Sequence, residues 1–264
     1  MNRGVVIHAQ NTKEINYVEC AEVLARSITR CMPNLHLSLL TDDIDSSPYF
    51  DKVIALPYGD LDPASNWKLV NDWQVYEASP YDYTIKLEAD LYITRSFDHW
   101  WDILSKKDVV ISTTIRNFKQ EVSNSRYYRK FIDDNKLPDV YNAITYFKKS
   151  ELAESFFNIV KDVFDYWPEY KKTLKCNVNE QCSTDWAYAI ACHILGVENT
   201  TLPNFDCMSM VHMKKHINNL QVENWQEVLV YELSKDMLKI NSYPQLYPFH
   251  YHVKNFSKKL VEVL

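Results

Sequence analysis

Short apolar runs alternate along the chain with longer segments in which apolar residues recur at helical spacing. Residues 4–9 form an apolar run typical of a buried strand. Residues 17–32 carry apolar side chains every three to four positions, which predicts a helix that ends before Pro33. Residues 35–40 and 52–56 predict two more strands. A strand, a helix and a strand in this order form a βαβ unit, which builds parallel sheets with right-handed crossovers.

The same alternation continues through the middle of the chain. Further strands are predicted from Tyr83 onward, at 108–113 and at 140–147, and helices at 67–78, 97–104, 151–167 and 184–195. Ser183 or Thr184 is expected to cap the last of these helices, and Gly196 to end it. The polar and basic residues 116–139 predict an excursion from the core, and the last 60 residues show no clear pattern. We therefore expect an α/β fold, one Rossmann-like domain over residues 1–264, with a mainly parallel central sheet flanked by helices.

Composition sets limits on how such a domain binds phosphate. The chain is 46% hydrophobic and 24% charged, which suits a packed core. It contains only 3 glycines, so neither a G-x-G-x-x-G loop nor a G-x-x-x-x-G-K loop is present. Phosphate groups would have to be held by a metal ion or by lysine and arginine.

Charge and cysteine spacing restrict the cellular setting. The net charge of −6 speaks against indiscriminate binding to nucleic acid, although a local basic patch would still permit it. The 6 cysteines show no C-x-x-C spacing, and residues 1–10 include no long apolar segment typical of a signal peptide. No run approaches the roughly 20 apolar residues that span a bilayer. We expect a cytoplasmic protein without a membrane partner.

Two acidic residues follow the strand that begins at Tyr83. Glu88 and Asp90 are two positions apart, so on an extended segment both carboxylates point the same way. Acids at the carboxyl end of a strand lie where open α/β sheets bind their ligands. Together they predict a site for Mn²⁺ or Mg²⁺; the alternative is that both acids are only solvated at the strand end.

Four segments resemble the GT-A-type glycosyltransferases, especially the glycogenin-like and bacterial galactosyltransferase-like group and related transferases of T-even-type phages. They are residues 4–11 with 37–43, the strand and acidic pair at 79–91, the strand and following turn at 141–150, and the helix start at 184–191. They occur in the order of the family. The resemblance implies a GT-A fold with a nucleotide-sugar-binding half at 1–115 and an acceptor-side half with a C-terminal segment at 116–264.

The resemblance also implies roles for individual residues. Asp90 matches the firmer metal ligand of the family's D-x-D motif, and Glu88 replaces the first Asp, where it ligates the metal or contacts the ribose. Asp185 and Asn142 match catalytic positions on the acceptor side, although Asp185 is also placed to interact with a helix dipole, and Ile144 replaces the family's glycine after Ala143. The residues expected to bind the nucleotide-sugar donor are Ala9, Asn11, Asp42, Lys68, Glu88 and Lys258.

A late histidine segment completes the expected metal site. The family carries His-x-x-Gly-x-x-Lys, and the spacing is met by His252, Asn255 and Lys258 with Asn in place of Gly. His250 competes with His252 as the ligand. An imidazole beside carboxylates suits Mn²⁺, and Lys258 is expected to neutralise the leaving diphosphate.

The acceptor is inferred from the basic excursion. Aromatic rings are interleaved there with five basic residues: Arg116, Lys119, Arg126, Arg129 and Lys130. Such a mixture suits a polyanion with stackable bases, and a solvated loop is the alternative. With the phage resemblance, we expect transfer from UDP-glucose, or a UDP-pentose such as UDP-arabinose, to 5-hydroxymethylcytosine in double-stranded phage DNA. The alternatives are a saccharide acceptor of lipopolysaccharide or capsule, and a GT-A-like binding module without catalysis.

Overall fold

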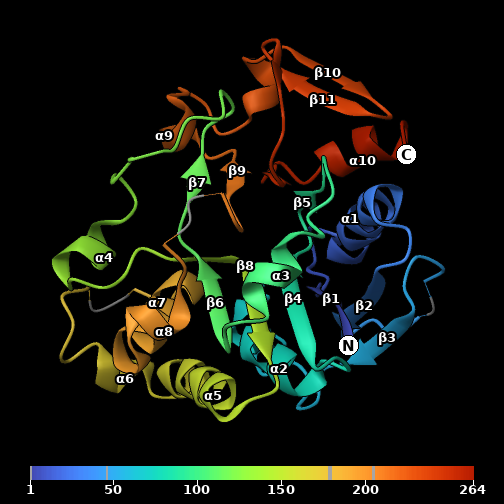
Figure 1. The fold of residues 1–264 in the computed structure, drawn as a ribbon. Coiled ribbons are helices and arrows are strands. Elements are labelled where there is room, and N and C mark those ends of the chain that lie inside the picture. Colours follow the sequence, from blue (N-terminus) through green and yellow to red (C-terminus); the bar gives the residue numbers. More distant parts are fainter. Residues whose placement is uncertain (1, 46, 178–179, 204–205) are drawn as a thin grey trace.

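Strands and helices alternate along most of the chain in the computed structural model, which describes residues 2–45, 47–177, 180–203 and 206–264 (Figure 1). The strands are β1 (Arg3–His8), β2 (His36–Thr41), β3 (Lys52–Ala55), β4 (Tyr83–Glu88), β5 (Leu91–Tyr92), β6 (Val109–Ser112), β7 (Ile115–Arg116), β8 (Tyr141–Lys148), β9 (Met210–His212), β10 (Tyr231–Ser234), β11 (Met237–Ile240), β12 (Tyr243–Pro244) and β13 (Phe249–His250). The helices are α1 (Tyr17–Cys31), α2 (Val75–Ala78), α3 (Trp100–Leu104), α4 (Lys130–Asp134), α5 (Glu151–Asp165), α6 (Trp167–Tyr170), α7 (Thr184–Leu195), α8 (Val197–Thr200), α9 (Lys215–Asn218) and α10 (Phe256–Val261), with 3₁₀ helices η1 (Lys68–Gln74) and η2 (Trp225–Glu227).

The central sheet has the strand order β3-β2-β1-β4-β8-β6. Strands β3, β2, β1 and β4 pair in parallel, whereas β8 runs antiparallel to both β4 and β6. Only β8 therefore opposes the common direction, and the expected mainly parallel sheet is confirmed. The parallel strands β1 and β4 end together, because His8 is level with Glu88 in their register.

Both faces of this sheet are covered by helices. Along β1, Val5 and Ile7 belong to the hydrophobic cluster on the α1 side, whereas Val6 belongs to the cluster that includes residues of α5 and α7. This alternation follows from the two-residue period of a strand. In Figure 1, α1 lies on one side of β1 and β2, and α5 to α8 gather at the opposite end of the sheet. The flanking helices inferred from the sequence are thus present.

A second sheet brings the late part of the chain to the end of β4. Its order is β5-β13-β9-β7, with β13 antiparallel to β5 and parallel to β9. The pairing sets His250 opposite Leu91 and His212 beside His250. A third, antiparallel sheet of β10, β11 and β12 lies near α10, toward the top right of Figure 1.

The elements predicted before residue 195 are recovered with small shifts at their ends, and one differs in kind. The helix expected at 67–78 divides into the 3₁₀ helix η1 and the short helix α2. Side chains of η1 bind the preceding loop: Asn71 Oδ1 accepts from the Leu61 amide at 3.0 Å, and Gln74 Oε1 from the Tyr58 amide at 2.9 Å. We attribute the tighter winding of η1 to these contacts.

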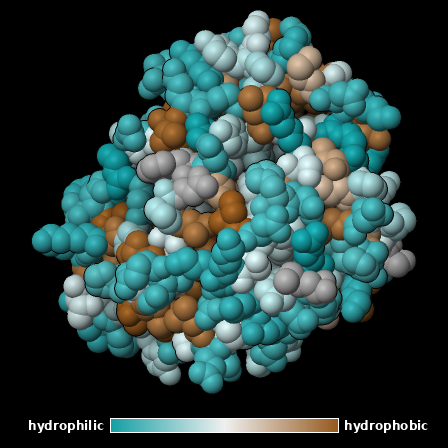
Figure 2. Space-filling model, viewed as in Figure 1, coloured by the Kyte–Doolittle hydropathy of each residue, from teal (hydrophilic) through white to brown (hydrophobic). Residues whose placement is uncertain are grey.

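The outer surface is mainly hydrophilic on the face shown in Figure 2, with small hydrophobic groups over the lower left, where α6 to α8 lie. Among the described residues, no helix combines the length and the apolar character needed to cross a bilayer.

Candidate active site

A cavity of about 290 Å³ opens at the carboxyl ends of β1 and β4. Its walls come from segments spread over the whole chain. They are residues 8–10, Thr12, Tyr17, 66–69, 88–90, 141–143, 183–185, Met210, His212, Lys214, His250, His252 and Lys254. Ligands of open α/β folds bind in this position, so the cavity is the candidate site.

Two carboxylates and one imidazole meet in this cavity. His250 Nε2 lies 3.0 Å from Asp90 Oδ2 and 3.4 Å from Glu88 Oε2. Each of the three residues offers a ligand atom within 4.8 Å of the others. The pairing of β13 with β5 explains the meeting, because it aligns His250 with the residue that follows Asp90. Two carboxylate oxygens and an imidazole nitrogen are a donor set suited to Mn²⁺ and similar divalent ions.

Asp90 is held in its ionised form by its neighbours. Burial alone would raise its pKa, but the positive charges of His250 and Lys254 outweigh burial and hold the pKa of this carboxyl well below its usual range. Lys254 Nζ donates directly to Asp90 Oδ2. An ionised Asp90 is the form that binds a cation.

The residues that sequence spacing offered as alternatives lie in different places. His250 contacts the carboxylates, whereas His252 Nε2 lies 3.3 Å from a ring nitrogen of His212. Lys254 is the lysine at Asp90, and Lys258 is exposed on α10 and does not line the cavity. The reason is helical geometry, because the buried Phe256 and Leu260 of α10 occupy the opposite face.

Asp185 and Asn142 also line the cavity and form one hydrogen-bonded chain with Glu88. Asp185 Oδ1 accepts from the Asn142 amide at 3.0 Å, and Asn142 Nδ2 donates to Glu88 Oε1 at 2.9 Å. The second oxygen of Asp185 accepts from Arg129 Nη1 at 2.8 Å. Ser183 caps the helix that begins at Thr184, which places Asp185 in the first turn of α7.

The residues expected to bind the donor divide into two groups. Ala9 and Lys68 line the cavity, and Lys68 Nζ is paired with Asp60 Oδ2 at 2.5 Å. Asn11 and Asp42 do not line it: Asn11 donates to Asp43 at 3.1 Å, and Asp42 accepts from Gln10 at 3.2 Å. Asp42 is therefore joined to the cavity wall by its hydrogen bond with Gln10.

A buried ionic network, not anticipated from the sequence, lies behind the cavity. Asp72 Oδ1 is 2.7 Å from Lys86 Nζ and 3.2 Å from His8 Nδ1, and its other oxygen accepts from the Tyr188 hydroxyl at 2.6 Å. Lys86 also donates to the Asn142 carbonyl at 3.2 Å. Burial opposes ionisation of Asp72, but Lys86 and His8 outweigh it and keep its pKa well below the usual range. The network joins β1, η1, β4 and α7 beneath the candidate site.

The basic residues of the excursion do not form a free cationic surface. Arg129 has 2% of its side chain exposed and is bound to Asp185, Asp139 and the Val140 carbonyl. Three of the others are also paired with aspartates, and Lys119 is exposed. The pairs are Arg116 with Asp206 at 2.9 Å, Arg126 with Asp133 and Asp139, and Lys130 with Asp134. The buried Arg129 differs most from the sequence interpretation, because its guanidinium supports the cavity.

Comparison with known proteins rests on structures. No family model and no curated protein matches the chain. An active-site mutant of LgtC has a TM-score of 0.55 and 12% identity, over 98% of this chain and 94% of LgtC. The bifunctional glycosyltransferase WbbM has a TM-score of 0.53 and 13% identity, over 99% of this chain but only 49% of its own. These neighbours are GT-A-type glycosyltransferases, so the expected fold class is confirmed.

Proposed function

We propose that the chain is a metal-dependent glycosyltransferase that moves a sugar from a nucleotide-sugar donor to an acceptor hydroxyl. One observation carries the proposal: Glu88, Asp90 and His250 converge in a cavity at the end of β4, in a chain with a GT-A fold. The structural neighbours share the fold, and the converging side chains supply the chemistry. The donors that we propose are UDP-glucose or a UDP-pentose such as UDP-arabinose.

The residues present fit a divalent ion, and Glu88, Asp90 and His250 would hold it. Such an ion supplies positive charge for the diphosphate of the donor. Lys254 lies on the same side of the cavity through its contact with Asp90 and adds a second positive charge there. Asp185 and Asn142, joined to Glu88 by hydrogen bonds, would orient the sugar and the acceptor hydroxyl.

Asp90→Asn tests the proposal most directly. We expect it to lower the hydrolysis of UDP-sugar, measured without acceptor in the presence of Mn²⁺, by at least about 100-fold, because a neutral amide binds a cation far less well than a carboxylate. Asp98→Asn is the matched control, since Asp98 is exposed, forms an ion pair with Arg3 and does not line the cavity. Two results would refute a metal-dependent transferase. One is an unchanged rate of UDP-sugar hydrolysis by the wild-type protein in excess chelator, and the other is the wild-type rate in the Asp90→Asn variant.

The acceptor remains a prediction. Transfer to 5-hydroxymethylcytosine in phage DNA was inferred from a basic segment, and four of its five cations are now seen paired with aspartates. This pairing favours the saccharide acceptor, which needs no cationic surface. Wild-type protein should be incubated with Mn²⁺ and a panel of UDP-sugars, with hydroxymethylcytosine DNA in one arm and oligosaccharides in the other. Mass spectrometry of nucleosides and glycans decides between them, and donor hydrolysis without transfer would leave both acceptors unsupported.

A further inference from the structure

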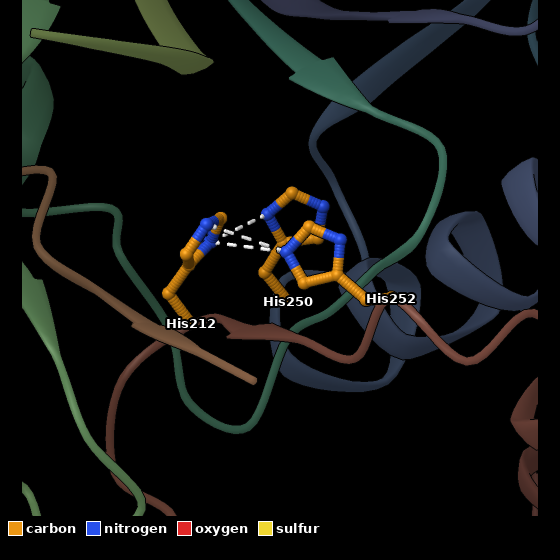
Figure 3. A group of neighbouring side chains, drawn as sticks. All are labelled: His212, His250 and His252. Atoms are coloured by element: carbon orange, nitrogen blue, oxygen red, sulfur yellow. Dashed lines mark hydrogen bonds between the residues drawn. The ribbon is translucent and has the colours of Figure 1, made fainter. Parts of the chain in front are cut away.

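Three histidines form a cluster beside the carboxylates, and the expected metal site uses only one of them. His212 is on β9, His250 on β13, and His252 follows β13. His212 Nδ1 lies 3.1 Å from His250 Nδ1, and His252 Nε2 lies 3.3 Å from the ring nitrogens of His212 (Figure 3). The rings of His250 and His252 are stacked with centroids 4.0 Å apart, and each meets the ring of His212 in a T-shaped contact.

Two of the three rings are buried, and in the described part of the chain only His250 also contacts carboxylates, through its Nε2. His212 is 4% exposed and His250 is 3% exposed. Within the part of the chain that the structure describes, the ring nitrogens of His212 and His252 have hydrogen-bond partners only among these histidines. A structural histidine that is buried normally binds a carbonyl, a carboxylate or a hydroxyl. Imidazole nitrogens that face only one another are instead arranged like metal ligands.

The backbone supports the same arrangement. His252 has a φ of 55°, in the left-handed region that residues with a Cβ atom rarely adopt. Such conformations persist where the surrounding structure holds them and are concentrated at functional sites. At this position the conformation accompanies the stacking of His252 on His250, with the Nε2 of His252 directed toward His212.

The spacing of the nitrogens matches a tetrahedral ion. Zinc binds imidazole nitrogen at about 2.0–2.1 Å, so two ligands of a tetrahedron are roughly 3.3–3.4 Å apart. His212 Nδ1 lies 3.1 Å from His250 Nδ1 and 3.3 Å from His252 Nε2, close to this edge, and the three ligand atoms all lie within 4.8 Å of one another. The three histidines line the cavity, so the fourth coordination position of such an ion would face the cavity.

We propose that His212, His250 and His252 bind one divalent ion of the type that favours imidazole, such as Zn²⁺ or Co²⁺, at a site distinct from the carboxylate site. The two sites share His250 through opposite nitrogens: Nε2 faces Asp90, and Nδ1 faces His212. A neutral imidazole coordinates through one nitrogen, so an ion at the histidine site competes for His250 with an ion at the carboxylates. The site does not depend on the sugar-transfer reaction.

Co²⁺ titration of the nucleotide-free protein tests the proposal, because tetrahedral Co²⁺ absorbs visible light strongly. We expect the signal to saturate at one equivalent in the wild type and in a Glu88→Gln, Asp90→Asn double variant. It should be lost in His212→Gln and, independently, in His252→Gln, whose side chain is at the cavity edge. His99→Gln, just before α3, is the control, since His99 is exposed and outside the cluster. Circular dichroism spectra establish that each variant is folded, and Zn²⁺ should displace Co²⁺.

Three results would contradict the proposed histidine site. Absence of the tetrahedral signal in wild-type protein would show that the cluster is only a chain of hydrogen bonds. Loss of the signal in the carboxylate double variant would show one mixed site, and its survival in both histidine variants would place the ion elsewhere. None of these outcomes concerns sugar transfer, which is assayed separately with Mn²⁺ and UDP-sugar.

Discussion

At the residue scale, hydrogen bonds from neighbouring residues fix the orientation of the Asp185 carboxylate. One of its oxygens accepts from the Asn142 amide and the other from Arg129, so its orientation is fixed before any substrate binds. A carboxylate held in this way acts through its position and its negative charge. Its effect should be greatest where positive charge develops on the transferred sugar, and small in the binding of the donor.

Asp185→Asn should therefore lower kcat about 10- to 100-fold and change the Kd of UDP-sugar by less than about threefold, a loss felt mainly in the transition state. Donor affinity is measured by calorimetry, and turnover by release of UDP. The control is Asp162→Asn on the exposed face of α5. If donor affinity falls as much as turnover, Asp185 belongs to the donor site or to the fold.

Arg129 could not be assigned correctly from the sequence. Four other basic residues and several aromatic residues surround it in a polar stretch, and this composition is the same for a solvated loop and for a buried ionic contact. Its partners, Asp139 and Asp185, lie 10 and 56 positions away, and only the fold brings them together. The ion pair between Lys86 and Asp72 could not be predicted either, because Lys86 lies within a predicted strand and Asp72 lies on a different element.

At the element scale, the pairing of strands β5 and β13 decides which late residues reach the site. Each strand has two residues, too short to show a periodicity, so neither was predicted. The long elements before residue 195 were predictable because α1 and α5 carry apolar faces over 15 residues each, and because β8 has 8 residues, all buried except Lys148. The histidine motif was found by spacing, but spacing alone does not tell which lysine faces the cavity.

Substitution of Lys254 and of Lys258, which lies on α10, distinguishes the roles of these two lysines. Lys254→Ala should lower donor hydrolysis about 10- to 100-fold, because a charged contact worth about 1.5–3 kcal/mol is lost beside Asp90. Lys258→Ala, on the exposed face of α10, should change the rate by less than about twofold and serves as the matched control. Rates are compared at saturating Mn²⁺ and UDP-sugar. The reverse order of effects would restore Lys258 as the diphosphate ligand.

At the scale of the whole molecule, the buried network around Asp72 connects the sheet to both the cavity and α7. Asp72→Asn should destabilise the protein by about 3–5 kcal/mol, because Lys86 would keep a buried charge without its partner. Asp165→Asn is the contrast: it breaks an exposed pair with Lys161 and should cost about 0.5 kcal/mol or less. Urea unfolding measures both. Equal losses would show that the network contributes no more than a surface ion pair.

The contribution of the same network to the free energy of unfolding should depend on pH. The pKa of Asp72 is lowered in the folded protein, so its stabilisation is complete above the pKa of an unfolded Asp, about 3.9, and declines as the pH falls below it. The difference in unfolding free energy between wild type and Asp72→Asn should therefore be constant near neutral pH and shrink in acid.

The wide separation of the ligand residues has a consequence for synthesis on the ribosome. Asp90 and His250 are contributed by β-strand regions that a ribosome, adding about 5–20 residues per second, makes some ten to thirty seconds apart. Until His250 and Lys254 have emerged, the buried carboxylate of Asp90 lacks the neighbours that hold its pKa low. A growing chain can complete most of its central sheet during this interval and still be unable to hold a metal at Asp90. At the proposed metal site, ion capture would therefore follow the synthesis of residue 250, and a chain interrupted earlier would lack the imidazole ligand.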